Sequence, residues 1–238
     1  MEPEMQPVYT LEELAKFLNR PAKDIQKLAE KDILKGRKFQ GKWVFALADV
    51  VLWMEKEMTR VEIDKTVELE NAVSRVSGES EEDVSLASLL DVQTIDLAFS
   101  AKTKSSIINE IVKLPEQIGK LWDAGAMAEA LLEREEMAST ALDHGVAIMH
   151  PRRPQADIIS EDFLALAIAR KPIPFGGGFA NETDVFFLLC CQTDVSYLRT
   201  LGKLARTLKT PGFLDELREC PDAESVIDLV KKAERHLA

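Results

Sequence analysis

A fully apolar run at residues 185–191 restricts the fold of this chain more than any other feature. Its sequence, Val-Phe-Phe-Leu-Leu-Cys-Cys, has no polar face, which indicates a central strand covered on both sides. Other strand-like runs occur at residues 92–99, 146–149 and 164–168. Helix-like runs alternate with them, at residues 105–114, 124–136, 197–208 and 223–237. This alternation predicts an α/β domain in which helices flank a β-sheet.

The N-terminal part of the chain has a different pattern. Thr10 followed by Glu13 is a capping box that predicts the start of a helix, and Pro21 suits the first turn of a second helix. Apolar residues then alternate on either side of a Gln-Gly turn at residues 40–41, which predicts a β-hairpin. A third helix is expected at residues 48–54. Helix, turn, helix, hairpin and helix is the order of a winged helix-turn-helix domain, which is mostly α-helical.

Charge is distributed unevenly, which favours two modules with a connector between them. Residues 16–42 contain nine Lys or Arg and three Asp or Glu, whereas residues 61–90 contain two Lys or Arg and eight Asp or Glu. The net charge of −11 argues against non-specific nucleic-acid binding by the whole molecule, but the basic head attracts phosphate backbones. We expect a winged helix-turn-helix domain at 1–56, an acidic and largely helical linker at 57–85, and an α/β domain at 86–238. The linker is either a solvated helix or a dimerisation helix.

Residues 9–54 resemble the excisionase-type, MerR-like winged helix-turn-helix domains. The resemblance is carried by Tyr-Thr-Leu-Glu-Glu-Leu-Ala at 9–15, Gly-Lys-Trp-Val-Phe at 41–45 and Leu-Ala-Asp-Val-Val-Leu-Trp at 47–53. It implies that the second helix enters the major groove of double-stranded DNA while the hairpin, or wing, touches the backbone. The residues expected at the DNA are Lys23, Gln26 and Lys27, with Arg20 and Lys42 as phosphate contacts. In the alternative interpretation these lysines form an ordinary solvated helix face, and the domain binds a protein.

The most specific motif lies at residues 134–152, Arg-Glu-Glu-Met-Ala-Ser-Thr-Ala-Leu-Asp-His-Gly-Val-Ala-Ile-Met-His-Pro-Arg. This run is similar to the enzyme IIA domains of the fructose/mannitol and nitrogen-regulatory class in the bacterial phosphotransferase system. That family carries an Arg-Glu pair, a Ser-Thr pair, a Gly-Val-Ala-Ile strand and a Pro-His at the same relative spacings. The resemblance covers residues 86–238 and implies a mixed β-sheet flanked by helices.

The same resemblance implies that His150 accepts a phosphoryl group and that Arg134 holds its oxygens. A neutral imidazole nitrogen is nucleophilic near neutral pH and is able to leave again. A guanidinium binds phosphoryl oxygens bidentately. Thr140 and Ser139 are expected to assist through hydroxyl or backbone contacts. For this chemistry we expect Arg134 beside His150 at an open mouth that solvent reaches, with room for a tetrahedral anion.

The chain departs from the family pattern at several positions. Met149 stands where a proline usually precedes the acceptor, and Tyr197 falls where the family has a second active-site histidine. A tyrosine donates a hydrogen bond to phosphate but cannot share its charge as an imidazolium does. This departure weakens the case for onward transfer to a sugar-transporter subunit more than the case for receipt of a phosphoryl group. Three residues that stand where glycines are common predict a stiffer loop, namely Ala138, Ala141 and Asp143.

These features predict a phosphorylation-responsive DNA-binding regulator from a bacterium. Its expected partners are the histidine-containing phosphocarrier protein of the phosphotransferase system and double-stranded DNA, and a sugar permease subunit and a second copy of the chain are further candidates. Two alternatives stay open. The chain could be a phosphocarrier component of a sugar phosphotransferase system with no transcriptional role. It could also be a regulator that binds proteins and is not phosphorylated.

Composition sets the remaining expectations. Three cysteines without a CxxC pair form neither a disulfide framework nor a zinc site, so we expect reduced thiols, no metal and no cofactor. No apolar stretch reaches the roughly 18 residues that a membrane span needs, so no membrane insertion is expected. The acidic N-terminus lacks the basic and apolar regions of a secretory signal. A cytoplasmic location is therefore expected.

Overall fold

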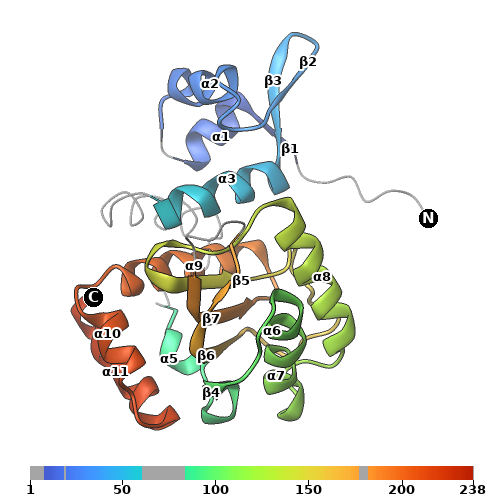
Figure 1. The fold of residues 1–238 in the computed structure, drawn as a ribbon. Coiled ribbons are helices and arrows are strands. Elements are labelled where there is room, and N and C mark those ends of the chain that lie inside the picture. The colour runs from blue at the N-terminus through green and yellow to red at the C-terminus, as the bar shows by residue number, and fades with distance from the viewer. Residues whose placement is uncertain (1–7, 19, 61–83, 177–181, 238) are drawn as a thin grey trace.

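The computed structural model describes residues 8–18, 20–60, 84–176 and 182–237 of the chain. We call the described residues up to 60 the head and those from 84 onward the body. The head lies on one end of the larger body, with one helix between them (Figure 1). The expectation for an acidic linker falls mostly outside the described residues.

The head combines helices with a small antiparallel sheet of order β1-β3-β2. Its order of elements confirms the predicted helix-turn-helix arrangement, although the short strand β1 was not predicted. The elements are β1 (Val8–Thr10), α1 (Leu11–Phe17), α2 (Ala22–Glu30), β2 (Arg37–Phe39), β3 (Lys42–Ala46) and α3 (Leu47–Arg60).

Local sequence explains most of these boundaries. The backbone N–H of Glu13 donates to the Thr10 hydroxyl at 3.3 Å and the N–H of Thr10 donates back to the Glu13 carboxylate at 2.8 Å, so the predicted capping box is present. Gln40 and Gly41 have φ of 49° and 79°, the two left-handed residues of a tight hairpin turn. Pro21 is the N-cap residue of α2, without a side-chain cap hydrogen bond, and so lies just before the first turn in which it was predicted.

Helix α3 is longer than the sequence analysis predicts. The expected helix ended at residue 54, but α3 continues to Arg60. The sequence Glu-Lys-Glu-Met after residue 54 contains good helix formers and neither Gly nor Pro, so nothing interrupts the helix there. As a result Glu55, which follows the predicted end of the helix, is an interior residue of α3.

The body is an α/β unit with short helices between its strands. Its strands are β4 (Ile95–Phe99), β5 (Val146–Met149), β6 (Phe163–Pro174) and β7 (Glu182–Cys190). Its α-helices are α5 (Leu86–Leu89), α6 (Lys104–Ile111), α7 (Lys113–Gln117), α8 (Ala124–Met137), α9 (Asp194–Leu208), α10 (Phe213–Arg218) and α11 (Ala223–Leu237). Two 3-10 turns precede strands, η1 (Val92–Thr94) and η2 (Asp143–Gly145).

The four strands form one mixed sheet of order β4-β6-β7-β5, which confirms the predicted fold class (Figure 1). The two central strands β6 and β7 are antiparallel, whereas β4 pairs with β6 and β5 pairs with β7 in parallel. Side chains of β7 alternate between two separate apolar cores. The apolar run therefore is a central strand buried on both faces, as predicted.

Helices cover both faces of the sheet (Figure 1). Buried residues of α6 and α8 pack on one face, and buried residues of α5, α9 and α11 pack on the other. The helix predicted at residues 105–114 is split into α6 and α7. Pro115 explains the split, because it cannot donate to the carbonyl of Ile111 and its ring would collide with that carbonyl.

The head and body share one apolar core. Helix α3 packs on α9, and the buried apolar residues of the head form a continuous cluster with those of the α9 face of the sheet. Among the described helices, none is both long enough and apolar enough to cross a membrane.

Candidate functional site

Three elements bring the predicted site residues together at the end of the body that faces the head. His150 directly follows strand β5, whose last residue Met149 pairs with Leu188 of β7. Arg134 lies in the last turn of α8, and Tyr197 lies near the start of α9, which follows β7. Because β5 and β7 run in parallel, the residues after both strands meet at one edge of the sheet.

The Arg134 guanidinium lies against the ring of His150, as the resemblance implies. Its Nε donates to His150 Nε2 at 3.1 Å, and its Nη1 donates to the carbonyl of Ala138 at 2.7 Å. The other ring nitrogen, Nδ1, lies 2.9 Å from the carbonyl oxygen of Ile148. A carbonyl only accepts, so Nδ1 carries a proton and the lone pair of a neutral ring belongs to Nε2. The nucleophilic nitrogen therefore faces the arginine.

Thr140 lines a cavity with His150, but its hydrogen bonds are to other residues. Its backbone N–H donates to the Glu135 carboxylate at 2.8 Å, its hydroxyl donates to the same carboxylate, and Lys104 pairs with Glu135 at 3.1 Å. The carbonyl of Thr140 accepts from the N–H of Ile148 at 3.2 Å. Thr140 thus joins the loop after α8 to strand β5. Ser139 is exposed and its hydroxyl accepts from the N–H of Ala141 at 3.2 Å.

Tyr197 lies beside the imidazole, with ring centroids 5.1 Å apart. Its side chain is buried, and its hydroxyl lies near the Glu55 carboxylate without a well-formed hydrogen bond among the described residues. Burial first, and then the negative charge of Glu55, raise the pKa of the phenol well above its ordinary value, although Arg134 acts in the opposite direction. The hydroxyl therefore stays protonated and is available as a donor to an anion at His150.

The expectation of an open mouth is wrong, because the head covers the site. His150 and Arg134 are each only 3% exposed. Glu55 of α3 enters from above the ring, where its carboxylate accepts from Nη2 of Arg134 and its Oε2 lies 3.1 Å from Nε2 of His150. The wall over the ring therefore combines this carboxylate with apolar side chains of the same helix, Ala48, Val51 and Leu52.

Two small cavities remain at this contact. The first has a volume of about 20 Å³ and is lined by α3, by the segment after β5 and by the start of α9. Such a volume holds a single water molecule. The second, about 70 Å³, lies between Glu55 and the loop that carries Thr140.

The charge state of Glu55 fits this contact. Burial acts to raise the pKa of its carboxyl, but the charge and hydrogen bond of the His150 ring in its protonated form, followed by those of Arg134, outweigh burial and leave the pKa below its ordinary value. A buried carboxylate is tolerated only when it is paired and hydrogen-bonded, and here both conditions are met. The docked glutamate is therefore ionised at neutral pH.

The predicted DNA-facing residues lie on the part of the head that is remote from the body. Helix α2 and the wing formed by β2 and β3 project away from the body (Figure 1). Lys23 and Lys42 are exposed there. Lys27 and Gln26 are engaged in exposed contacts along α2, with Asp24 at 3.2 Å and Glu30 at 2.7 Å respectively.

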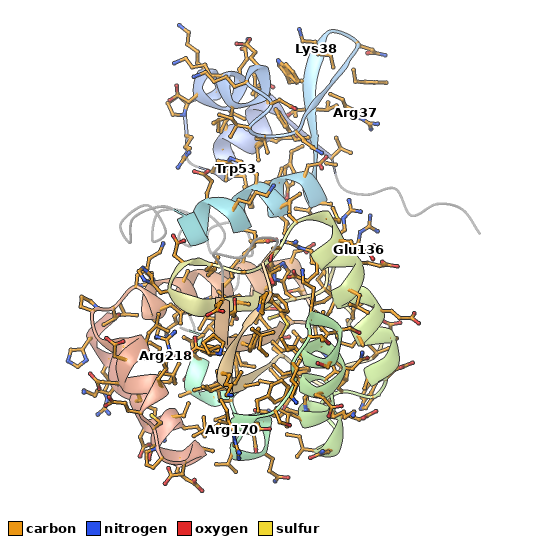
Figure 2. All side chains as sticks on the ribbon, in the orientation of Figure 1. Arg37, Lys38, Trp53, Glu136, Arg170 and Arg218 are labelled. Atoms are coloured by element: carbon orange, nitrogen blue, oxygen red, sulfur yellow. The ribbon has the colours of Figure 1, made fainter. Side chains whose placement is uncertain are left out.

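Arg20, the predicted phosphate contact, also makes a contact within the head. Its guanidinium lies 5.6 Å from the centre of the ring of Trp53, a buried residue of α3 (Figure 2). This cation–π contact favours a role in holding the helices of the head together. The wing adds two cations that the sequence analysis did not select, Arg37 and Lys38, at the end of the molecule opposite to the body (Figure 2). Their position beside the predicted turn is the signal that could have identified them.

Among the described residues, no group of His, Cys, Asp and Glu side chains is arranged to hold a metal ion. Cys190 and Cys191 are buried in the core as free thiols. The groups that converge on the ring of His150 are those of Arg134, Tyr197 and Glu55, of which the first two can donate to an oxyanion and the third is itself an anion.

The comparisons with known proteins agree with this geometry. Residues 88–233 match the family model of the phosphoenolpyruvate-dependent sugar phosphotransferase system, EIIA 2, and residues 8–58 match a helix-turn-helix domain. Over 148 residues the chain is 28% identical to the nitrogen regulatory protein of Bradyrhizobium diazoefficiens. This match covers 61% of this chain and 94% of that protein.

A second relative is much longer than the matching segment. Over 152 residues the chain is 25% identical to the fructose-specific EIIABC component of the Bacillus subtilis phosphotransferase system. The match covers 63% of this chain and 24% of that protein.

Solved structures show the same fold. The nitrogen regulatory protein IIA-Ntr from Neisseria meningitidis has a TM-score of 0.54 at 25% identity, with 60% of this chain and 97% of that chain covered. The IIA mannitol protein from Escherichia coli has a TM-score of 0.53 at 17% identity, with 59% and 98% covered, and supports the fold alone. The chain belongs to the EIIA 2 family of the phosphoenolpyruvate-dependent sugar phosphotransferase system, and it carries a helix-turn-helix domain ahead of its EIIA 2 domain.

Proposed function

We propose that this chain is a phosphorylation-responsive DNA-binding regulator of the cytoplasm whose His150 accepts a phosphoryl group from the histidine-containing phosphocarrier protein. The observation that carries the proposal is the 3.1 Å contact between Arg134 Nε and His150 Nε2. An arginine at this distance from a nucleophilic ring nitrogen can donate to the oxygens of a phosphoryl group that is transferred to that nitrogen. The presence of a helix-turn-helix domain in the same chain supports a regulatory purpose.

The transfer needs only a bond exchange at phosphorus. Nε2 of His150 attacks the phosphorus in line, and the bond from phosphorus to the donor's ring nitrogen breaks, with its electron pair kept by the donor. The proton stays on Nδ1, which donates to the carbonyl oxygen of Ile148, and this hydrogen bond orients the ring. Arg134 binds the developing charge with the edge formed by Nε and Nη2, while Nη1 is anchored by Ala138. The buried hydroxyl of Tyr197 donates to a further oxygen.

The DNA-binding half of the proposal rests on the outer part of the head. Lys23 and Lys42 are exposed on α2 and on the wing, and the body leaves this side uncovered (Figure 1). Cations that meet phosphates release counterions, which gives salt-dependent affinity. A bound phosphoryl group adds about two negative charges at the contact between body and head, so the two halves are coupled by electrostatics.

The test combines labelling with DNA retention. The full chain is incubated with labelled phosphoenolpyruvate, the general transfer enzyme of the system and the phosphocarrier, and acid-labile label is measured on the wild type, on His150→Ala and on His144→Ala. His144 is exposed and serves as the matched control. We expect label on the wild type and on His144→Ala, none on His150→Ala, and a change in retention of genomic DNA fragments upon labelling.

The other outcomes separate the alternatives. Label that discharges rapidly to a sugar permease subunit, with no DNA retention, would identify a phosphocarrier. The absence of label on the wild type, in the presence of a phosphorylated donor, would identify a regulator that acts through binding alone.

A further inference from the structure

Glu55 occupies the space that a phosphoryl group on His150 would need. The carboxylate contacts Nη2 of Arg134 and lies 3.1 Å from Nε2 of His150, the atom to which phosphorus would be bonded. Its side chain is 11% exposed. A phosphoryl group needs the same two partners, a guanidinium edge and the ring nitrogen. The glutamate therefore uses the contacts of the phosphoryl group before any phosphoryl group is present.

The two anions cannot occupy the site together. A carboxylate binds Nε2 through a proton on that nitrogen, and once the lone pair of Nε2 is bonded to phosphorus no such proton is left, so the contact cannot remain. The cavity of about 20 Å³ that remains beside Glu55 holds one water molecule but not a tetrahedral anion. Two negative groups within a few ångströms of each other, in a site with little solvent, also repel strongly.

Removal of Glu55 requires movement of the whole helix. Glu55 is an interior residue of α3, and Ala48, Val51 and Leu52 line the same cavity from the same helix. Val51 and Glu55 are four residues apart and so lie on one face of α3. This face packs on α9, whereas α1, α2 and the wing lie on the other side of α3 (Figure 1). If the Glu55 carboxylate leaves Arg134, α3 must therefore move away from α9, and the contact between head and body is lost.

We infer that Glu55 is an internal stand-in for the phosphoryl group, so that docking of the head on the body and phosphorylation of His150 exclude each other. The inference rests on the proposed function and adds its regulation. In the unphosphorylated chain, α3 closes the site and fixes the orientation of α2 and the wing relative to the body. Phosphorylation replaces the carboxylate at Arg134 and releases the head. Binding of DNA by the head and access of the phosphocarrier to His150 are thereby linked through one helix.

The first arm of the test measures how fast His150 is labelled. Glu55→Gln keeps the shape of the side chain and removes its charge. Glu57→Gln, on the same helix but outside both cavities at the site, is the matched control. Two donors are used, the phosphorylated phosphocarrier and the small molecule phosphoramidate, which needs no docking surface. If the head is docked about nine tenths of the time, Glu55→Gln is labelled about tenfold faster with both donors, and Glu57→Gln is labelled at the wild-type rate.

The second arm measures docking without any substitution. Amide hydrogen exchange in α3 and the radius of gyration are compared for the wild type before and after labelling, with exchange in β7 as the control for an intact fold. We expect faster exchange in α3 and a larger radius of gyration after labelling, and a change of similar size in unlabelled Glu55→Gln.

The outcomes distinguish this inference from the proposed function. Equal labelling rates for wild type and Glu55→Gln, together with unchanged exchange in α3 after labelling, would overturn the inference and leave His150 as an acceptor. Absence of label on every variant with both donors would overturn the proposed function and the inference with it. Faster labelling of Glu55→Gln with α3 released after labelling supports both.

Discussion

The chemistry of the site depends on a single atom of one residue. Nδ1 of His150 is held by the carbonyl of Ile148, and Nε2 is left to face Arg134 and Glu55. The ring is thereby fixed in both orientation and tautomer, which is the usual way in which a histidine is prepared for one partner. Tyr197 adds a buried hydroxyl without a well-formed hydrogen bond among the described residues. Such a group costs free energy in the folded state and gains a partner only when an anion arrives.

The substitution Tyr197→Phe should therefore have two effects of opposite sign. Removal of an unsatisfied buried hydroxyl should stabilise the fold by about 1 kcal/mol. Loss of a donor to a charged group should slow labelling of His150 by roughly tenfold to a hundredfold, which corresponds to about 1.5–3 kcal/mol. Denaturant unfolding and the rate of labelling measure the two effects. A variant that is less stable, yet labelled at the wild-type rate, would show that the hydroxyl has a structural partner instead.

The raised pKa of Tyr197 gives a prediction for alkaline pH. The unfolded chain releases the phenol proton near pH 10, while the folded chain retains it to higher pH. The contribution of this group to stability is thus complete below pH of about 10 and is lost as pH rises through the folded-state pKa. The chain has only two tyrosines, Tyr9 and Tyr197. The difference in tyrosinate absorbance between the wild type and Tyr197→Phe over a pH series is therefore the titration of Tyr197. Ionisation of Tyr197 in the intact fold near pH 10 would contradict the burial described above.

Elements rather than single residues determine where the site groups lie. The loop between α8 and β5 is held by Glu135, which accepts from the backbone and hydroxyl of Thr140 and pairs with Lys104. Strand β5 then delivers His150, and the end of α8 delivers Arg134. Thr140 therefore acts as a positioning residue for the loop in our description, and the family resemblance alone could not distinguish this from direct contact with phosphate.

Truncation of Glu135, which anchors the loop between α8 and β5, should lower the stability of the fold. Glu135→Ala leaves the buried N–H and hydroxyl of Thr140 without their acceptor, so we expect a loss of about 1–3 kcal/mol in the free energy of unfolding. The neighbouring Glu136 is exposed on the same helix, and Glu136→Ala should change stability by no more than about 0.5 kcal/mol (Figure 2). Denaturant unfolding of both variants is the measurement. Equal stability of the two would mean that the loop is not anchored through Glu135.

Lysines on two elements of the head give a prediction for DNA. Lys23→Ala on α2 and Lys42→Ala on the wing should weaken binding to all duplex sequences alike, and each should reduce the slope of log affinity against log salt by about 1. Lys16 is exposed on α1 and Lys16→Ala is the control, which should leave the slope unchanged. Fluorescence anisotropy over a salt series measures the slopes. Unchanged slopes for Lys23→Ala and Lys42→Ala would move the DNA surface elsewhere on the head.

The sequence was most informative where local chemistry decides the structure. The capping box of Thr10, the Gln-Gly turn of the wing and the apolar run of β7 each determine an element without help from distant residues. The same approach did not find strand β1 or the split between α6 and α7. β1 is three residues long and depends on pairing with β3, and the split depends on one proline.

At the scale of the whole molecule, the site belongs to both modules. The pairing of Arg134 with His150 could be expected because 16 residues separate them within one motif. The contact of Arg134 with Glu55 spans 79 residues and two domains, and it arises from the packing of α3 on α9. No pattern in the sequence marks Glu55 as buried, since a charged residue in an acidic segment is ordinarily solvated. Only the packed structure reveals that the head closes the site of the body.

The most direct test of the account is to identify the phosphorylated atom. The chain labelled with ¹⁵N-histidine is phosphorylated through the phosphocarrier, and nuclear magnetic resonance detects coupling between ³¹P and the ring nitrogens. We predict coupling to Nε2 of His150 alone, with Nδ1 still protonated, and no phosphorus on His144 or His236. Phosphorus bonded to Nδ1, or to a different histidine, would contradict the assignment of His150 Nε2 as the acceptor.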